Sequence, residues 1–129
     1  MSTYNDHVDN INSGGCAFGI DIQTSKLKKY GYSDIHAVGV KVLTEHPITK
    51  TVFENFSIPF FPQVKELALK TASFMPGLRL IGWDVAIGES GPVLIEGNSN
   101  YEISGSDFLN GGYLANTTFR KVLHEINYL

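Results

Sequence analysis

Residues 80–98 predict a β-hairpin, and this hairpin restricts the fold more than any other segment. Two apolar runs, at 80–87 and 93–95, flank a segment at 88–92 that contains two glycines and a proline. Apolar runs separated by turn-forming residues are typical of two antiparallel strands joined by a short connection. We therefore expect the chain to fold around a sheet that includes this strand pair.

The two faces of the predicted hairpin differ in character. Side chains alternate across a strand, so the large apolar residues Trp83, Val85 and Ile87 share one face. Gly82 and Ala86 lie on the other face, where they leave space above the sheet. We therefore expect one face to pack against a core and the other face to remain open.

Three polar residues lie on the open face of the hairpin. Asp84 belongs to the first strand, and Glu96 and Asn98 end the second. Asp84 should lie opposite Glu96 to within about one residue, where two carboxylates repel each other. A hard cation such as Mg²⁺ or Mn²⁺ between these oxygen ligands would remove that cost. The pattern alone equally allows a pair of edge carboxylates at the end of an ordinary hairpin.

The composition is that of one modest globular domain. A chain of 129 residues suits a single domain over residues 1–129, and a net charge of −3 gives no basic surface for nucleic acid. The single cysteine, Cys16, cannot form an internal disulfide, so we expect a cytoplasmic location and a packing role for this thiol. No apolar run reaches the roughly 20 residues that span a bilayer.

The first half of the chain predicts strands. Residues 1–13 are polar and should form an extended arm, and His46 with Pro47 should open a turn. Alternating apolar residues predict three strands between the arm and this turn. These strands should cover residues 16–22, 27–32 and 35–43.

The second half combines helices with the hairpin. Apolar residues recur at three- and four-residue spacing after Pro62, which predicts an amphipathic helix over residues 62–74. The segment 98–112 is rich in serine, asparagine and glycine and predicts a long loop, and residues 113–127 predict a closing helix. The element order indicates an α+β fold, with a mainly antiparallel sheet and helices on one of its faces.

The hairpin sequence resembles the metal site of ATP-grasp enzymes. Asp84 is followed a dozen residues later by a Glu-x-Asn sequence on the neighbouring strand. The phrases IGWDVAI at 81–87 and GPVLIEGN at 91–98 are similar to those of the sugar-transfer-associated ATP-grasp family. The resemblance extends from about Asn10 to the C-terminus, and it implies the C-terminal portion of an ATP-grasp fold.

The resemblance implies a metal-binding role for each polar residue of the hairpin. Asp84 would ligate one Mg²⁺ ion (or Mn²⁺), Glu96 would bridge two ions, and Asn98 would ligate the second. The ions would lie on the phosphates of ATP and neutralise the charge that develops during phosphoryl transfer.

The resemblance also implies contacts with the nucleotide. Leu94 or Ile95 would lie near the adenine, because the residue before the bridging glutamate often does so in the family. Asn12, Gly14 and Gly15 would lie near the phosphates or the acceptor substrate.

The implied reaction is ATP-dependent ligation of a carboxylate to an amine or a similar nucleophile, through an acyl phosphate. The expected partners are therefore a nucleotide and a small-molecule or sugar-linked substrate, which the family suggests is a cell-envelope or capsular polysaccharide precursor. No catalytic residue is predicted besides the metal ligands.

Two departures from the family pattern leave the activity open. Many ATP-grasp ligases carry an arginine two residues before the metal-binding acid, where this chain has Gly82. Arg79 should instead project to the opposite face as a solvated residue. The sequence also shows no glycine-rich loop or strand lysines of the N-terminal nucleotide-binding lobe.

These departures leave two interpretations of the chain open. The chain is either the metal-binding half of a ligase or a non-catalytic module that binds a protein partner or a glycan. In the first case, apolar surface left bare by the absent lobe favours a homodimer.

Overall fold

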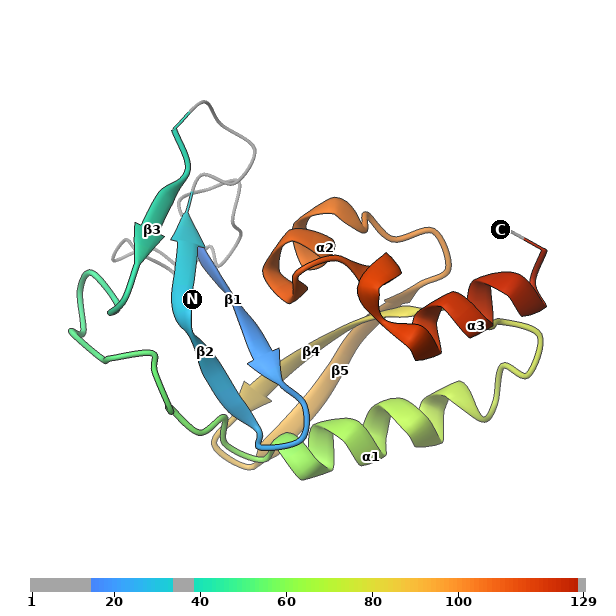
Figure 1. Ribbon diagram of the computed structural model, residues 1–129. Helices are drawn as coiled ribbons and strands as arrows, with labels where there is room; N and C mark the ends of the chain where they lie inside the picture. Colours follow the sequence, from blue (N-terminus) through green and yellow to red (C-terminus); the bar gives the residue numbers. More distant parts are fainter. Residues whose placement is uncertain (1–14, 34–38, 128–129) are drawn as a thin grey trace. The chain divides into compact units, whose positions relative to one another are not determined.

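The computed structural model describes residues 15–33 and 39–127, which form two compact units, Met1–Ile58 and Pro59–Leu129 (Figure 1). The predicted α+β class is confirmed, because the described strands pair antiparallel and three α-helices accompany them. These strands form two separate hydrogen-bonded sheets instead of the single sheet expected. No helix in the described ranges is long and apolar enough to cross a membrane.

The first unit contains a three-stranded antiparallel sheet. Its strands are β1 (Cys16–Asp21), β2 (Lys26–Ser33) and β3 (Lys41–Leu43), in the order β1-β2-β3. The first two strands confirm the prediction to within one residue at each end. The third is shorter than expected, because Gly39 has a φ of 111° and the chain is not extended until Lys41. Positions 35–38 of this predicted strand and the predicted arm at 1–13 lie outside the described residues.

Phe53 is the centre of the core in the first unit. It is only 1% exposed, and its ring lies 4.2 Å from that of Phe18 in an edge-to-face arrangement. Gly31 passes so close to the Phe18 ring that no side chain fits at this position. Cys16 is buried, as its predicted packing role requires, and Nδ1 of buried His46 accepts the Thr49 N–H at 3.1 Å within the predicted turn.

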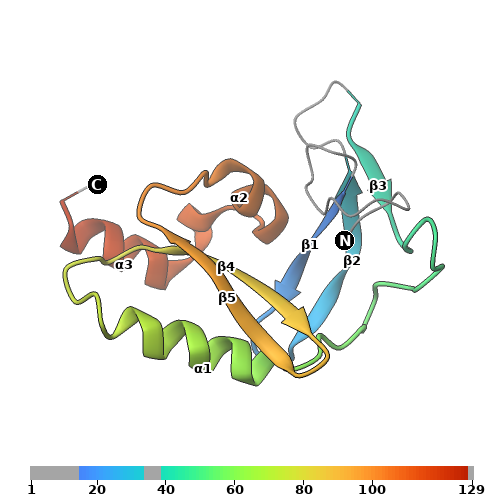
Figure 2. The same ribbon diagram turned by 180° about the vertical axis from the view of Figure 1, so that it is seen from behind.

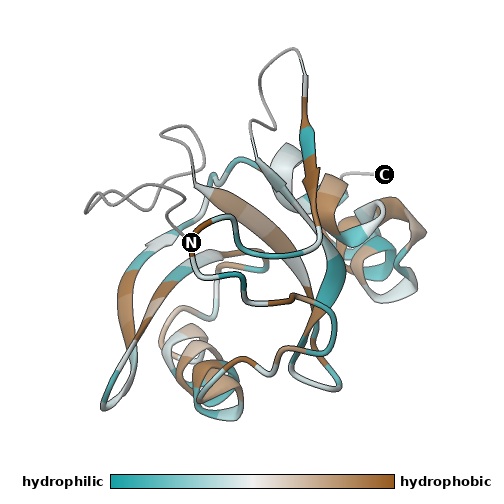
Figure 3. Ribbon diagram, turned by 90° about the vertical axis from the view of Figure 1, so that its left-hand side faces the viewer, coloured by the Kyte–Doolittle hydropathy of each residue, from teal (hydrophilic) through white to brown (hydrophobic). Residues whose placement is uncertain are grey.

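The second unit begins with helix α1 (Phe61–Ala72) and the hairpin of β4 (Gly82–Gly88) and β5 (Gly91–Asn98). Helix α1 confirms the predicted helix, has its proline in the first turn and packs against β5 (Figures 1 and 2). Hydrophobic and hydrophilic residues are interleaved along α1, as in an amphipathic helix (Figure 3).

The segment after the hairpin differs from the prediction. The expected loop at 98–112 contains a helix, α2 (Ser104–Asn110), which Gly111 ends with a left-handed backbone conformation. The sequence signal was missed because serine and glycine have low helix propensity and α2 has only 7 residues. The helix expected at 113–127 is divided into a 3₁₀ turn, η2 (Tyr113–Ala115), and helix α3 (Thr117–Glu125).

Asn116 is the physical reason for this division. Its backbone is extended, and its side-chain oxygen accepts hydrogen bonds from the N–H groups of Thr118 and Phe119, both at 3.0 Å. An asparagine that caps the first turn of a helix cannot also continue a helix from the preceding residues. Asn116 therefore starts α3 and fixes the position of Phe119.

Candidate functional site

The hairpin turn is tighter than the sequence predicted. Gly88 pairs with Gly91, which leaves Glu89 and Ser90 as a two-residue connection. Gly91 has a φ of 122°, a conformation that favours glycine and reverses the chain abruptly. Pro92 therefore lies inside β5 instead of in the turn.

A bulge in β5 places Glu96 directly opposite Asp84. Val85 pairs with Leu94, and the next pair is Asp84 with Glu96, so Ile95 is an extra residue on its strand. Without this bulge the register would place Ile95 opposite Asp84. The predicted carboxylate pair is thus confirmed, and the bulge creates it, as bulges near functional sites often re-aim a side chain.

Asn98 completes the polar group on the same face. It pairs with Gly82, two residues from Asp84, and its Nδ2 donates a hydrogen bond to Glu96 Oε1 at 2.8 Å. Because this bond uses the amide nitrogen, the amide oxygen is the atom of Asn98 suited to a cation. Partial burial raises the pKa of Asp84 above its usual value, and the neighbouring Glu96 raises it further.

These donors fit a cation of a particular kind. Two carboxylates and an amide oxygen are hard ligands, as Mg²⁺ prefers. Within residues 15–33 and 39–127, no group of three or more His, Cys, Asp or Glu side chains is arranged to hold a metal ion. Mg²⁺ commonly takes one or two carboxylates and completes its shell with phosphates and water. The site therefore suits a Mg²⁺ ion that arrives with a phosphate-bearing ligand.

Asp84 and Asn98 open onto a pocket of about 340 Å³ that also includes Glu102, called the smaller pocket below. Glu102 follows Asn98 by four residues and accepts a hydrogen bond from the hydroxyl of Ser104 at the start of α2. Sequence reasoning did not place Glu102 beside the site, because residues 98–112 were predicted as a loop.

Tyr101 corrects the expectation of open space above Gly82. A Cβ atom at position 82 would lie 2.6 Å from the Cβ of Tyr101, so only glycine leaves room for this aromatic residue. Burial raises the pKa of the Tyr101 hydroxyl, and the neighbouring Tyr113 raises it further. Tyr101 therefore forms a wall beside the carboxylates.

The opposite face of the hairpin is packed only in part. The ring of Trp83 lies over its cross-strand partner Gly97, so closely that no side chain fits there. Trp83, Val85 and Leu94 are half-buried, whereas Ile87 is 40% exposed, which the prediction of a packed face did not foresee. Ile95, the bulged residue, is 64% exposed.

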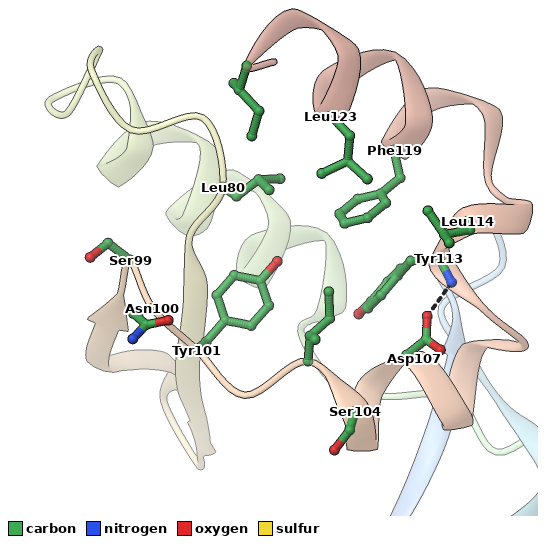
Figure 4. A pocket seen from close by; sticks show the side chains of 12 residues that line it. Leu80, Ser99, Asn100, Tyr101, Ser104, Asp107, Tyr113, Leu114, Phe119 and Leu123 are labelled. Atoms are coloured by element: carbon green, nitrogen blue, oxygen red, sulfur yellow. Dashed lines mark hydrogen bonds between the residues drawn. The ribbon is translucent and has the colours of Figure 1, made fainter. Parts of the chain in front are cut away.

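A larger pocket of about 610 Å³ lies next to the smaller one, lined by Leu80 just before β4, by residues 99–107 and by residues of η2 and α3 (Figure 4). Its aromatic lining includes Tyr101, Tyr113 and Phe119, and the last two rings stack with centroids 4.9 Å apart. The backbone N–H of Tyr113 donates to the carboxylate of Asp107. Tyr101 and Tyr113 line both pockets.

The remaining site predictions belong to the first unit or fall outside the described residues. Asn12 and Gly14 are not among the described residues, and Gly15 is buried next to β1. Arg79 forms an ion pair with Glu125 of α3, and both side chains are about half exposed. The expected surface role of Arg79 is confirmed.

A comparison with protein-family models gave a match that includes the hairpin. The model of the family described as sugar-transfer associated ATP-grasp matches residues 1–122, which include both strands of the hairpin. Neither the curated proteins nor the solved structures gave a match.

Proposed function

The chain belongs to the sugar-transfer-associated ATP-grasp family, and on this basis we propose that it is the metal- and nucleotide-binding C-terminal part of an ATP- and Mg²⁺-dependent carboxylate–amine ligase. Family membership itself indicates an ATP-dependent, ligase-like function associated with sugar transfer. The observation that carries the proposal is the bulged register, which places Asp84 opposite Glu96 with Asn98 bonded beside them.

In this proposal Asp84 ligates one Mg²⁺ ion, Glu96 bridges two, and Asn98 ligates the second. The ions would neutralise the charge on the ATP phosphates during phosphoryl transfer. Burial and then the neighbouring Glu96 raise the pKa of Asp84, and a cation beside the two carboxylates would offset this cost of ionising Asp84. Leu94 or Ile95 would contact the adenine, and Asn12, Gly14 and Gly15 the phosphates or the acceptor.

The proposed reaction has two steps. A substrate carboxylate oxygen bonds to the γ-phosphorus of ATP while the bond to the bridging oxygen breaks, so that ADP leaves. An amine or similar nucleophile then attacks the acyl carbon, phosphate leaves, and the amine loses a proton. We propose that the protein acts in the cytoplasm on a cell-envelope or capsular polysaccharide precursor, and the choice of substrate rests on the family association with sugar transfer.

Calorimetric titration with Mg²⁺ and a non-hydrolysable ATP analogue tests the site. The Asp84→Asn and Glu96→Gln variants should each weaken binding by about tenfold or more, because each replaces a negatively charged carboxylate with a neutral amide. Glu89→Gln is the matched control, since Glu89 is an exposed carboxylate in the turn of the same hairpin. Equal affinity in all four proteins would exclude the proposed ligands.

A second candidate is a non-catalytic ATP-grasp-derived module that binds a protein partner or a glycan. The absence of nucleotide binding at any metal concentration would favour this reading over the first.

We also propose a homodimer, supported by exposed apolar side chains such as Phe74 and Val42, which are 76% and 60% exposed. Sedimentation velocity over a range of concentrations tests it. A monomer at the highest concentration would contradict the dimer without affecting the metal site.

A further inference from the structure

The larger pocket differs in chemistry from the carboxylate site beside it. Its volume of about 610 Å³ falls in the range of small-molecule sites. Eight of its twelve lining residues are apolar or aromatic, and none of these described lining residues is Lys or Arg. A pocket lined without a cation is unsuited to a phosphate, whereas its aromatic and aliphatic walls suit an uncharged apolar group.

The walls of the larger pocket are fixed by specific contacts. The Tyr113 ring stacks on Phe119, and the Tyr113 N–H donates to Asp107 (Figure 4). The ion pair between Arg79 and Glu125 joins the segment next to Leu80 to helix α3. The pocket is therefore formed before any ligand binds, which reduces the entropy lost on binding.

The two pockets meet at Tyr101. This residue packs over Gly82, which lies on the same hairpin face as Asp84 and two residues before it. Because Gly82 has no side chain, the Tyr101 side chain occupies the space beside Asp84. A ligand that passes Tyr101 would have an apolar end in one pocket and a polar end in the other.

We propose that the larger pocket binds the apolar body of a carboxylic acid, whose carboxylate lies in the smaller pocket beside Asp84 and Asn98. This inference rests on the proposed function, because a carboxylate beside Asp84 requires a cation between them. The acid would be the donor that accepts the γ-phosphoryl group. It would carry an aliphatic or aromatic body, and any sugar would belong to the acceptor.

The test is a titration of the full chain, labelled with ¹³C at leucine methyls and observed by NMR. The probes are 3-phenylpropionate and 3-phenylpropionamide, which share a ring and chain and differ in charge. Either probe should shift the methyl signals of Leu80, Leu114 and Leu123, which line the pocket, and leave those of Leu69 on α1 unchanged.

Variants of exposed leucines show whether the pocket itself is responsible. Leu114 is 58% exposed, so the Leu114→Ser variant should still fold. Its affinity for the probe should fall about fivefold, because the substitution removes roughly 40 Å² of apolar contact. Leu69→Ser, at 73% exposure, is the matched control and should bind the probe like the unmodified chain.

The link to the metal site has its own readout. With Mg²⁺ and the ATP analogue present, the carboxylate should bind more tightly than the amide, and Asp84→Asn should abolish this preference. Absence of shifts at the pocket methyls would overturn the inference even if the analogue binds. Equal affinity of acid and amide would overturn the placement of the carboxylate. Pocket shifts without any analogue binding would refute the proposed function and the carboxylate placement together.

Discussion

Asp84 carries an electrostatic cost in the folded chain that a bound cation would offset. Partial burial and then Glu96 raise its pKa above the usual 3.8. The folded state therefore holds the Asp84 proton more tightly than the unfolded chain does, and the contribution to stability is lost as pH rises through the folded pKa. The site is thus destabilising at neutral pH in the absence of metal.

The first prediction follows from the upward direction of the Asp84 pKa shift. In EDTA at neutral pH, Asp84→Asn should raise the melting temperature slightly, and the gain should disappear as the pH falls below about 3.8, the usual aspartate value. Thermal unfolding followed by circular dichroism across this pH range measures the difference between variant and parent. Glu89→Gln, in the exposed turn, should show no such pH-dependent gain. A destabilised Asp84→Asn protein in EDTA would contradict the prediction.

Adding metal and nucleotide should reverse the order of the two proteins. A ligand at 100 times its dissociation constant stabilises the folded state by about 2.7 kcal/mol. With Mg²⁺ and the ATP analogue at that excess, the parent should melt above Asp84→Asn, and removal of Mg²⁺ with EDTA should restore the first order. If the melting temperatures of the two proteins differ by the same amount with and without Mg²⁺ and the analogue, Asp84 is not a ligand.

Gly97 tests the close packing on the other face of the hairpin. A side chain at this position would collide with the ring of Trp83, the single tryptophan. Gly97→Ala should therefore destabilise the protein by about 1–3 kcal/mol and change the tryptophan emission. Urea unfolding followed by fluorescence measures both effects. Gly77→Ala, where a Cβ meets nothing within 4 Å, is the control and should leave both unchanged.

At the scale of elements, alternation and helical periodicity were sufficient for β1, β2, α1 and the hairpin. They failed where a single side chain or a short helix decides the structure. Asn116 divides the last helix by capping, and α2 opens with Ser104, Gly105 and Ser106, which have little helical preference. Neither the Asn116 cap nor helix α2 produces a periodic pattern of apolar residues in the sequence.

The same limit applies to the candidate site. The facing of Asp84 and Glu96 was predictable to within one residue, but the bulge at Ile95 that establishes it depends on a turn shorter than the sequence indicated. Tyr101 and Glu102 could not be placed, since residues 98–112 were expected to form a loop and a loop predicts no contact partner for either side chain. Residues within the hairpin were thus predictable, and residues brought to it by later elements were not.

Asn116 provides a prediction about these later elements. Asn116→Ala removes the acceptor for the N–H groups of Thr118 and Phe119 and should lower stability by about 1 kcal/mol. It should also weaken 3-phenylpropionate binding, because Phe119 lines the larger pocket. Asn116→Ser keeps a capping oxygen and should behave much like the parent. Urea unfolding separates the two variants, and equal stability would show that the cap is dispensable.

At the scale of the whole molecule, the proposed contacts fall in both units. Asp84, Glu96, Asn98 and both pockets belong to Pro59–Leu129, whereas the proposed phosphate contacts Asn12, Gly14 and Gly15 belong to Met1–Ile58. The proposed metal ligands and the proposed phosphate contacts can therefore be tested separately.

Hydrogen exchange can separate these two contributions within one experiment. With Mg²⁺ and the ATP analogue, amides of β4 and β5 should exchange more slowly, because ligand binding suppresses local opening. If the phosphate contacts are correct, amides around Gly15 should gain protection as well, and Asp84→Asn should abolish both effects. Protection of the hairpin alone would support the proposed metal ligands and would exclude Asn12, Gly14 and Gly15 as phosphate contacts. Protection around Gly15 that survives in Asp84→Asn would show that the nucleotide binds independently of the metal site.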